Sequence, residues 1–134
     1  MKKDKLLCQL QDAFQRLKEA LEIPVSEPLT IDGTIQRFEF TFELAWKAIK
    51  SFMEDQGVLC HSPKSCIKEA FKMGWIHSEE EWLALLKARN MTTHVYNEAS
   101  AMGIYKEIHQ RHDLFQALIK ELANQQTQQT QQTQ

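Results

Sequence analysis

The sequence predicts a single all-α domain, an up-and-down bundle of four or five helices. Apolar residues recur at spacings of three and four along most of the chain, which is the period of a helix face that packs on a core. Helix breakers are scarce, with 4 glycines and 3 prolines among 134 residues. A chain of this length builds one hydrophobic core but not two independent ones, so all the helices should share that core.

The first two helices follow from long apolar stripes. The first is expected over residues 4–22, because Pro24 and Pro28 then interrupt the pattern. The second is expected over residues 32–56 and is apolar on several sides, so it should be the central helix, with Gly57 as its end signal. The stripes comprise Leu7, Leu10, Phe14, Leu17 and Leu21 in the first helix, and Ile31, Ile35, Phe38, Phe42, Ala45, Ile49 and Phe52 in the second.

Capping signals mark the start of the next two helices. Ser62 followed by Pro63 is typical of an N-cap and a first helical position, and Gly74 ends the short third helix. Ser78 and Glu81 match the capping box of a fourth helix, because a serine hydroxyl and a glutamate three residues later satisfy each other's backbone N–H groups.

The last third of the chain should hold a break, a final helix and a tail. The pattern becomes polar and β-branched over residues 91–97, which predicts a bend or break before the final helix. The stripe of that helix comprises Ile104, Ile108, Phe115, Leu118 and Leu122. From residue 125 onward only Gln and Thr occur, and such a segment buries nothing apolar to offset its ordering entropy. We therefore expect a bundle over residues 1–124 and a disordered tail over residues 125–134.

Two sets of side chains in these helices have simple structural interpretations. Glu43 and Lys47 are spaced as an i,i+4 ion pair in the favourable order on the second helix. Trp46, Trp75 and Trp82 are expected to be anchors in the core or at an interface, because large aromatic side chains are usually buried.

Charge and hydropathy exclude several function classes. The formal net charge is -2 and the pI is about 6.2, so the chain has no overall basic surface, and we expect no specific DNA binding. No segment approaches the roughly 20 apolar residues that span a bilayer, so we expect no membrane partner and no export. A cytoplasmic protein fits these properties.

The cysteines give no sign of a metal or a disulfide framework. Cys8, Cys60 and Cys66 are odd in number and lack C-x-x-C spacing. We expect them to be buried or idle thiols in a reducing compartment, and we expect no metal and no cofactor.

One cluster stands apart from the helical background, the string R-N-x-x-x-H-x-Y formed by Arg89, Asn90, His94 and Tyr96. An imidazole ordinarily titrates at about pH 6.5, so a histidine such as His94 is able to take or give a proton close to neutral pH. The guanidinium of Arg89 is suited to hold a phosphate through its planar fork of donors. In RNA the 2′-hydroxyl is an internal nucleophile, so a base and an anion stabiliser suffice for phosphodiester cleavage without metal.

The spacing of this cluster constrains its geometry. On a straight helix Arg89 and His94 lie about 140° apart, so they do not converge on one regular helix. Either the backbone distorts between them, as Thr92 and Thr93 permit, or a second subunit completes the site across a symmetric interface. Composition alone favours a plainer interpretation, in which the Arg makes a surface ion pair and the His is satisfied at a helix junction.

The same string resembles the signature of the HEPN superfamily, and it is most similar to the branch of HepT toxins and nucleotidyltransferase substrate-binding proteins. The likeness extends to the order of helices, to F-E-F-T-F-E-L-A-W-K at residues 38–47, and to the segment of short helix, Gly and Trp that ends at Trp75. It covers roughly residues 3–123 and leaves the Gln/Thr tail outside.

The resemblance implies a homodimer of up-and-down bundles, encoded beside a small minimal nucleotidyltransferase of the MntA type. In HepT-like toxins an Arg and a His form a metal-independent ribonuclease site at the dimer cleft, and the nucleotidyltransferase is the antitoxin, which transfers AMP to the motif Tyr. Carried over to this sequence, His94 is the general acid and base and Arg89 stabilises the transition state. Asn90 orients the RNA substrate or His94, and Tyr96 accepts AMP.

A second function class remains open. An Arg and a His that bind phosphate serve cleavage and binding equally well. The alternative is therefore a noncatalytic substrate-binding or regulatory subunit of a nucleotidyltransferase, and a third possibility is a purely structural helical dimer.

Overall fold

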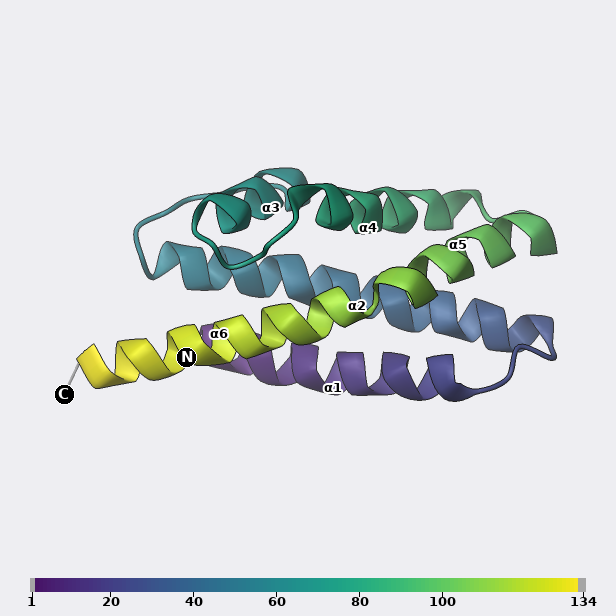
Figure 1. Ribbon diagram of the computed structural model, residues 1–134, viewed down its shortest axis with the longest axis horizontal. Coiled ribbons are helices and arrows are strands. Elements are labelled where there is room, and N and C mark those ends of the chain that lie inside the picture. The colour runs from purple at the N-terminus through teal and green to yellow at the C-terminus, as the bar shows by residue number, and fades with distance from the viewer. Residues whose placement is uncertain (1, 133–134) are drawn as a thin grey trace.

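The computed structural model describes residues 2–132, with side chains through residue 128, and this part of the chain is helical without any strand (Figure 1). The predicted all-α class is confirmed. The elements are α1 (Lys2–Glu22), α2 (Pro28–Glu54), α3 (Pro63–Lys72), α4 (Glu79–Met91), the 3-10 turn η1 (Thr92–His94), α5 (Glu98–Arg111) and α6 (Asp113–Gln132). None of the described helices is long and apolar enough to cross a bilayer.

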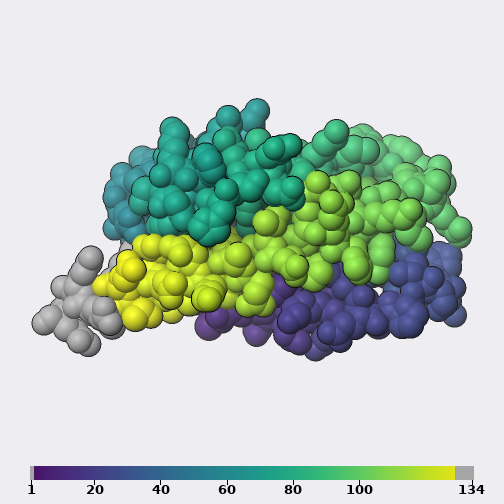
Figure 2. All heavy atoms as spheres, in the orientation of Figure 1, coloured from purple at the N-terminus to yellow at the C-terminus, as the bar shows by residue number. Residues whose placement is uncertain are grey.

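The helices form an up-and-down bundle around α2, the longest of them. Figure 1 shows α1 running antiparallel to α2, with α3 and α4 along the opposite side of α2. The chain returns through α5, which packs on α2 and α4, and then through α6, which packs on α1 and α2. In the space-filling view α5 and α6 lie in a strip between α4 and α1 (Figure 2). As a result the junction of α4 and α5 lies at the same end as the loop between α1 and α2.

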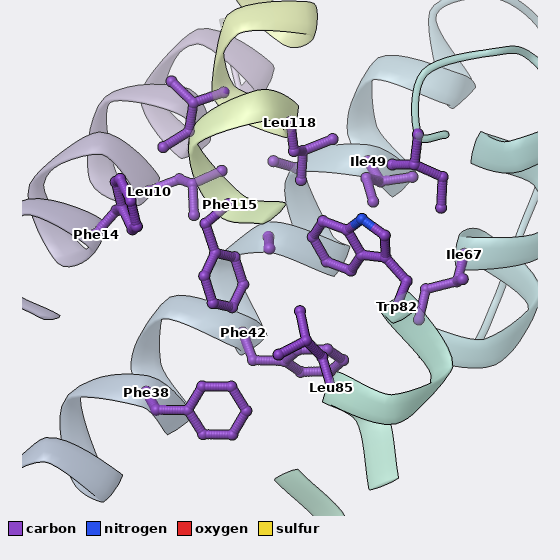
Figure 3. Close-up of a cluster of buried hydrophobic side chains, with 14 of the residues drawn as sticks. Leu10, Phe14, Phe38, Phe42, Ile49, Ile67, Trp82, Leu85, Phe115 and Leu118 are labelled. Atoms are coloured by element: carbon purple, nitrogen blue, oxygen red, sulfur yellow. The ribbon is translucent and has the colours of Figure 1, made fainter. Parts of the chain in front are cut away.

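The core is aromatic at its centre (Figure 3). Phe115 of α6 makes an edge-on contact with Trp82 of α4, with ring centroids 5.6 Å apart and planes at 89°. Its ring also lies 6.1 Å from Phe14 of α1 and 6.2 Å from Phe38 of α2. Each such pair contributes about 0.5–1.5 kcal/mol beyond its buried area. Phe115 therefore joins α6 to three other helices, α1, α2 and α4.

Local signals in the sequence set most helix ends as predicted. The side chain of Ser62 caps α3, and the side chain of Ser78 caps α4 by accepting the N–H of Glu81 at 3.1 Å. The predicted capping box is only half formed, because the Glu81 carboxylate pairs with Arg111 of α5 and does not accept the N–H of Ser78. Gly57 and Gly74 have φ of 76° and 77°, in the left-handed region that glycine adopts without a Cβ penalty, where α2 and α3 end. Trp75 and Trp82 are buried, in line with their expected role as anchors.

The C-terminal part differs from the prediction in two ways. The expected single final helix is divided at His112 into α5 and α6, because α5 packs on α2 and α4 whereas α6 turns toward α1. The helix also continues to Gln132, where a disordered tail from residue 125 was expected. Gln is a good helix former, and Gln125 donates to Glu121 at 2.9 Å while Gln126 donates to Asp4 of α1 at 2.5 Å. Residues 133 and 134 of the expected tail lie outside the described residues.

The prediction of three thiols is wrong for two of them. Cys60 and Cys66 form a disulfide, and both are buried. Ser62 and Pro63 turn the chain into α3 between them, so six positions of sequence separation become a Cα distance of 5.1 Å. Cys8 is a free, exposed cysteine on α1.

Candidate functional site

The R-N-x-x-x-H-x-Y string lies at the predicted break, where α4 ends and α5 begins. The hydroxyl of Thr92 donates to the carbonyl of Arg89 at 2.7 Å, and that of Thr93 donates to the carbonyl of Asn90 at 3.3 Å. The Arg89 carbonyl also accepts the backbone N–H of Thr92, so Thr92 closes the last turn of α4 through both of its donors. The chain then tightens into η1, so the two threonines supply the distortion that the sequence indicated.

After η1 the backbone becomes extended and carries His94 and Tyr96 to the surface. The phenol oxygen of Tyr96 lies 3.4 Å from Nδ1 of His94, and the ring centroids are 6.3 Å apart. Tyr96 is 80% exposed, more than any other large apolar or aromatic side chain in the described residues. Asn97 then starts α5, because its side-chain oxygen accepts the N–H of Ser100 at 2.9 Å. The structure therefore brings His94 and Tyr96 together on a short segment held at both ends.

Arg89 points away from that segment, toward α2. Its Nε donates to Oε1 of Glu43 at 2.9 Å, and the other oxygen of the same carboxylate accepts the indole N–H of Trp46 at 3.1 Å. Arg89 and Glu43 are about equally half-buried, with side chains 31% and 32% exposed. The predicted pair of Glu43 with Lys47 is wrong, since no ion pair joins them in the described residues and Glu43 is held by Arg89 instead.

Glu43 is the site residue that sequence reasoning missed. The signal was present in F-E-F-T-F-E-L-A-W-K, where Glu43 and Trp46 are three positions apart and share a helix face. The partner that gives Glu43 its importance is Arg89, which lies 46 positions away, so local spacing did not point to it.

The four predicted site residues form two groups and not one. No hydrogen bond or ion pair joins Arg89 to His94 within residues 2–128, as their angular separation on a helix predicted. Asn90 is exposed on the outer face of α4. Within one chain, then, His94 is grouped with Tyr96, and Arg89 is grouped with Glu43 and Trp46.

A groove of about 450 Å³ between α4 and α5 has His94 at one end. Its lining is mainly small or apolar, with Ala88 from α4 and Gly103 from α5, and it also contains one side chain of each charge, Lys87 and Glu107. A Cβ placed on Gly103 would meet no atom within 4 Å, so this face of α5 is open to a neighbouring surface.

A second hollow, of about 440 Å³, lies on the Tyr96 side, between the loop that joins α1 to α2 and the start of α5. Glu27, Asp32 and Glu98 line it, and no Lys, Arg or His does. Three carboxylates repel a phosphate backbone, whereas Lys87 and Glu107 balance each other in the groove that His94 lines. The electrostatics of the junction therefore disfavour a polyanion on the Tyr96 side.

Comparison with known proteins places these residues in context. A curated protein of Haemophilus influenzae described as probable ribonuclease HepT is 32% identical over 83 residues. That match covers 58% of this chain and 57% of the relative, so the two share little more than half of their lengths.

Two solved structures have the same fold. A Thermus thermophilus protein has a TM-score of 0.79 with 31% identity, over 84% of this chain and 98% of its own. A Haemophilus influenzae protein, described as revealing the fold of a substrate binding domain of a nucleotidyltransferase, has a TM-score of 0.78 with 26% identity over 87% and 98%. The family model for nucleotidyltransferase substrate binding protein like sequences matches residues 5–126, which include the whole junction. This chain therefore belongs to the nucleotidyltransferase substrate binding protein like family, as the resemblance of its R-N-x-x-x-H-x-Y string implied.

Proposed function

We propose that this chain is the toxin of a toxin-antitoxin pair, a metal-independent endoribonuclease that a partner minimal nucleotidyltransferase silences by transferring AMP to Tyr96. The observation that carries the proposal is the placement of the Tyr96 hydroxyl, 3.4 Å from Nδ1 of His94 on an exposed segment. A general base and an accessible modification site so close together suit an activity that is switched off by covalent addition. The likeness to a protein described as probable ribonuclease HepT supports the same assignment.

The cleavage step uses the RNA's own 2′-hydroxyl. His94 takes the proton of that hydroxyl, the 2′ oxygen forms a bond to phosphorus, and the bond from phosphorus to the 5′ oxygen breaks. A protonated imidazole returns a proton to the departing 5′ oxygen, which leaves a 2′,3′-cyclic phosphate and a 5′-hydroxyl. Arg89 stabilises the extra negative charge on the phosphoryl oxygens in the transition state, and Asn90 orients the RNA or His94.

A homodimer completes this site. The guanidinium and the imidazole do not touch within one chain, so a second copy of the junction supplies the missing group to a single phosphate. The outer face of α4 supports an interface here, because Leu83 and Leu86 are only half-buried and Met91 is 45% exposed. Apolar side chains on a solvent-facing surface are stabilised when a second surface covers them.

AMP on Tyr96 would block the reaction in two ways. The phenolic oxygen of Tyr96 forms a bond to the α-phosphorus of ATP, pyrophosphate leaves, and the phenolic proton is lost. A phosphodiester anion then stands where a neutral O–H faced His94. The nucleotide also adds bulk on the exposed side of the segment, where the RNA has to approach. Both effects oppose the binding of another phosphate at the same imidazole.

A noncatalytic role is the alternative. Arg89 pairs with Glu43 and is separated from His94 within the chain, and an Arg that binds phosphate without a base beside it serves the docking of a substrate but not its cleavage. The description of the Haemophilus influenzae fold as a substrate binding domain supports this alternative.

The decisive experiment compares His94→Ala with His109→Ala. Induced expression of the wild-type chain should slow growth, and the purified protein should cleave RNA equally well with and without EDTA. His94→Ala should relieve the growth defect and abolish cleavage, because the general base is gone. His109 is an exposed imidazole on α5 outside the junction, so His109→Ala should behave like the wild type.

Three results would contradict the proposal. Full toxicity of His94→Ala would remove His94 from the reaction. Cleavage that disappears with EDTA would exclude the metal-independent mechanism. A well-folded wild type that cleaves no RNA but binds the nucleotidyltransferase would favour the alternative.

A further inference from the structure

The carboxylate of Glu43 is held at both of its oxygens. Oε1 accepts from Nε of Arg89 at 2.9 Å, and Oε2 accepts from the indole N–H of Trp46 at 3.1 Å. Trp46 lies on the same helix, and its ring is partly buried against the core, so the indole fixes the carboxylate in turn. The half-buried ion pair joins the middle of α2 to the last turn of α4.

We propose that Glu43 is a positioning residue for the ribonuclease site, which orients Arg89 by its Nε edge and leaves its terminal amino groups to bind the RNA phosphate. This role rests on the proposed function. A guanidinium has five N–H donors in a plane, and a carboxylate at Nε leaves the edge formed by the two terminal nitrogens free. Within residues 2–128 those nitrogens donate no hydrogen bond. That free edge has the spacing of two phosphoryl oxygens.

The fixed orientation matters because Arg89 has a long side chain at the end of a helix. A free arginine samples many rotamers and loses that freedom when it binds phosphate. In the folded protein the Glu43 carboxylate already holds Arg89 in one orientation, so less side-chain entropy is lost when RNA binds. Arg89 therefore meets the charge that develops in the transition state without reorganising, which is where electrostatic stabilisation is most effective.

The same carboxylate has an opposite effect on binding. Its negative charge partly cancels that of Arg89, so it weakens the attraction for the RNA backbone in the ground state. Removal of the charge should thus lower kcat without raising KM for RNA. Partial unfolding also lowers the apparent kcat at unchanged KM, but it does so by the same factor whichever residue stands at position 89. A positioning residue is instead identified by a loss of kcat that depends on Arg89.

The test is a double-mutant cycle of Glu43→Gln with Arg89→Lys, measured by steady-state cleavage of an oligoribonucleotide. Glu43→Gln should reduce kcat by roughly tenfold to a hundredfold, with KM unchanged or lower. Lysine keeps the charge of Arg89 but has neither the Nε edge nor the planar fork. In the Arg89→Lys background, Glu43→Gln should therefore change kcat by no more than about twofold.

Two matched variants complete the design. Glu39→Gln makes the same charge change one turn earlier on α2 and should leave both constants near those of the wild type. Trp46→Phe keeps an aromatic ring but removes the N–H that fixes Glu43. Its kcat should therefore also fall, but by a smaller factor than that of Glu43→Gln. Thermal unfolding of each variant reports whether it is folded, and Trp46→Phe carries the test if Glu43→Gln is not.

The outcomes separate the two proposals. If wild-type cleavage depends on Arg89 and His94 but Glu43→Gln and Trp46→Phe leave kcat unchanged, the positioning role is overturned and the ribonuclease proposal stands. An equal loss from Glu43→Gln in the wild-type and Arg89→Lys backgrounds, or an equal loss in Glu39→Gln, also overturns it. If the folded wild type cleaves no RNA, the proposed function fails, and the positioning role fails with it.

Discussion

The Tyr96 hydroxyl faces two ways, toward Nδ1 of His94 at 3.4 Å and toward solvent, because the side chain is 80% exposed. At 3.4 Å the contact is at the long end of hydrogen bonding, so His94 depends little on it for its orientation. An enzyme that modifies a protein needs an accessible acceptor, and the exposed phenol meets that need. At the residue scale these two features suit the proposed role of Tyr96 as AMP acceptor better than a part in the cleavage step.

Tyr96→Phe should separate these two roles. We expect the variant to cleave RNA within about threefold of the wild type, since only a long hydrogen bond is lost. It should inhibit growth even when the partner nucleotidyltransferase is co-expressed, because the acceptor oxygen is missing. Intact mass measurement should find one AMP on the co-expressed wild type and none on Tyr96→Phe, while Tyr105→Phe, at a buried tyrosine of α5, should keep the adduct. An adduct that persists on Tyr96→Phe would place the modification elsewhere.

At the scale of elements, the α4–α5 junction is a short segment with a defined bond at each end. Threonine hydroxyls close α4, and the Asn97 side chain opens α5 by accepting the N–H of Ser100 at 2.9 Å. Val95 at the middle is half-buried against the core, whereas His94 and Tyr96 on either side of it are exposed. Caps and one apolar anchor thus hold a segment that makes few other contacts.

Asn97→Ala should cost both stability and cleavage. Loss of an N-cap lowers the free energy of unfolding by about 1 kcal/mol, which urea denaturation measures. Asn97→Asp keeps an oxygen acceptor and should recover most of that loss. Ser62→Ala removes the N-cap of α3, far along the chain from the junction, and should cost similar stability while cleavage by the folded protein is kept. If both alanine variants cleave equally well, the cap does not hold the site in place.

At the scale of the whole molecule, the bundle separates Arg89 from His94. α4 packs on α2 and on α5, and Arg89 faces α2 whereas His94 lies at the end of the groove beside α5. A rigid core built around Phe115 and Trp82 opposes any rotation of α4 that would bring the two side chains together. The proposed homodimer would supply the group that one chain does not bring to the phosphate.

Subunit mixing tests that arrangement. Arg89→Ala and His94→Ala should each be inactive alone, and co-expression of the two should restore roughly a quarter of wild-type activity per chain, because half of the dimers are mixed and each keeps one of its two sites. Differently tagged chains allow the mixed dimers to be purified and assayed. Inactive mixed dimers would mean that each site takes both residues from one chain, and a monomeric mass at micromolar concentration would exclude the dimer.

Much of the secondary structure of this protein could be predicted from its sequence, because short-range interactions determine it. Apolar spacing, serine caps and helix-ending glycines act within a few residues, so the order of the helices and the break at residues 91–97 were predicted correctly. The motif also showed which side chains lie at the junction, and helical geometry showed that Arg89 and His94 diverge.

Tertiary structure decided the features that join distant parts of the chain. Arg89 pairs with Glu43 across 46 positions, and Gln126 bonds Asp4 across 122, so no local pattern indicated either contact. The disulfide of Cys60 with Cys66 depends on how tightly the chain turns into α3. The sequence by itself determined the first four helices, the break that follows them and which residue types stand there, because those depend on neighbours along the chain. The packing of α2 against α4 decided which way Arg89 faces, because that depends on neighbours in space.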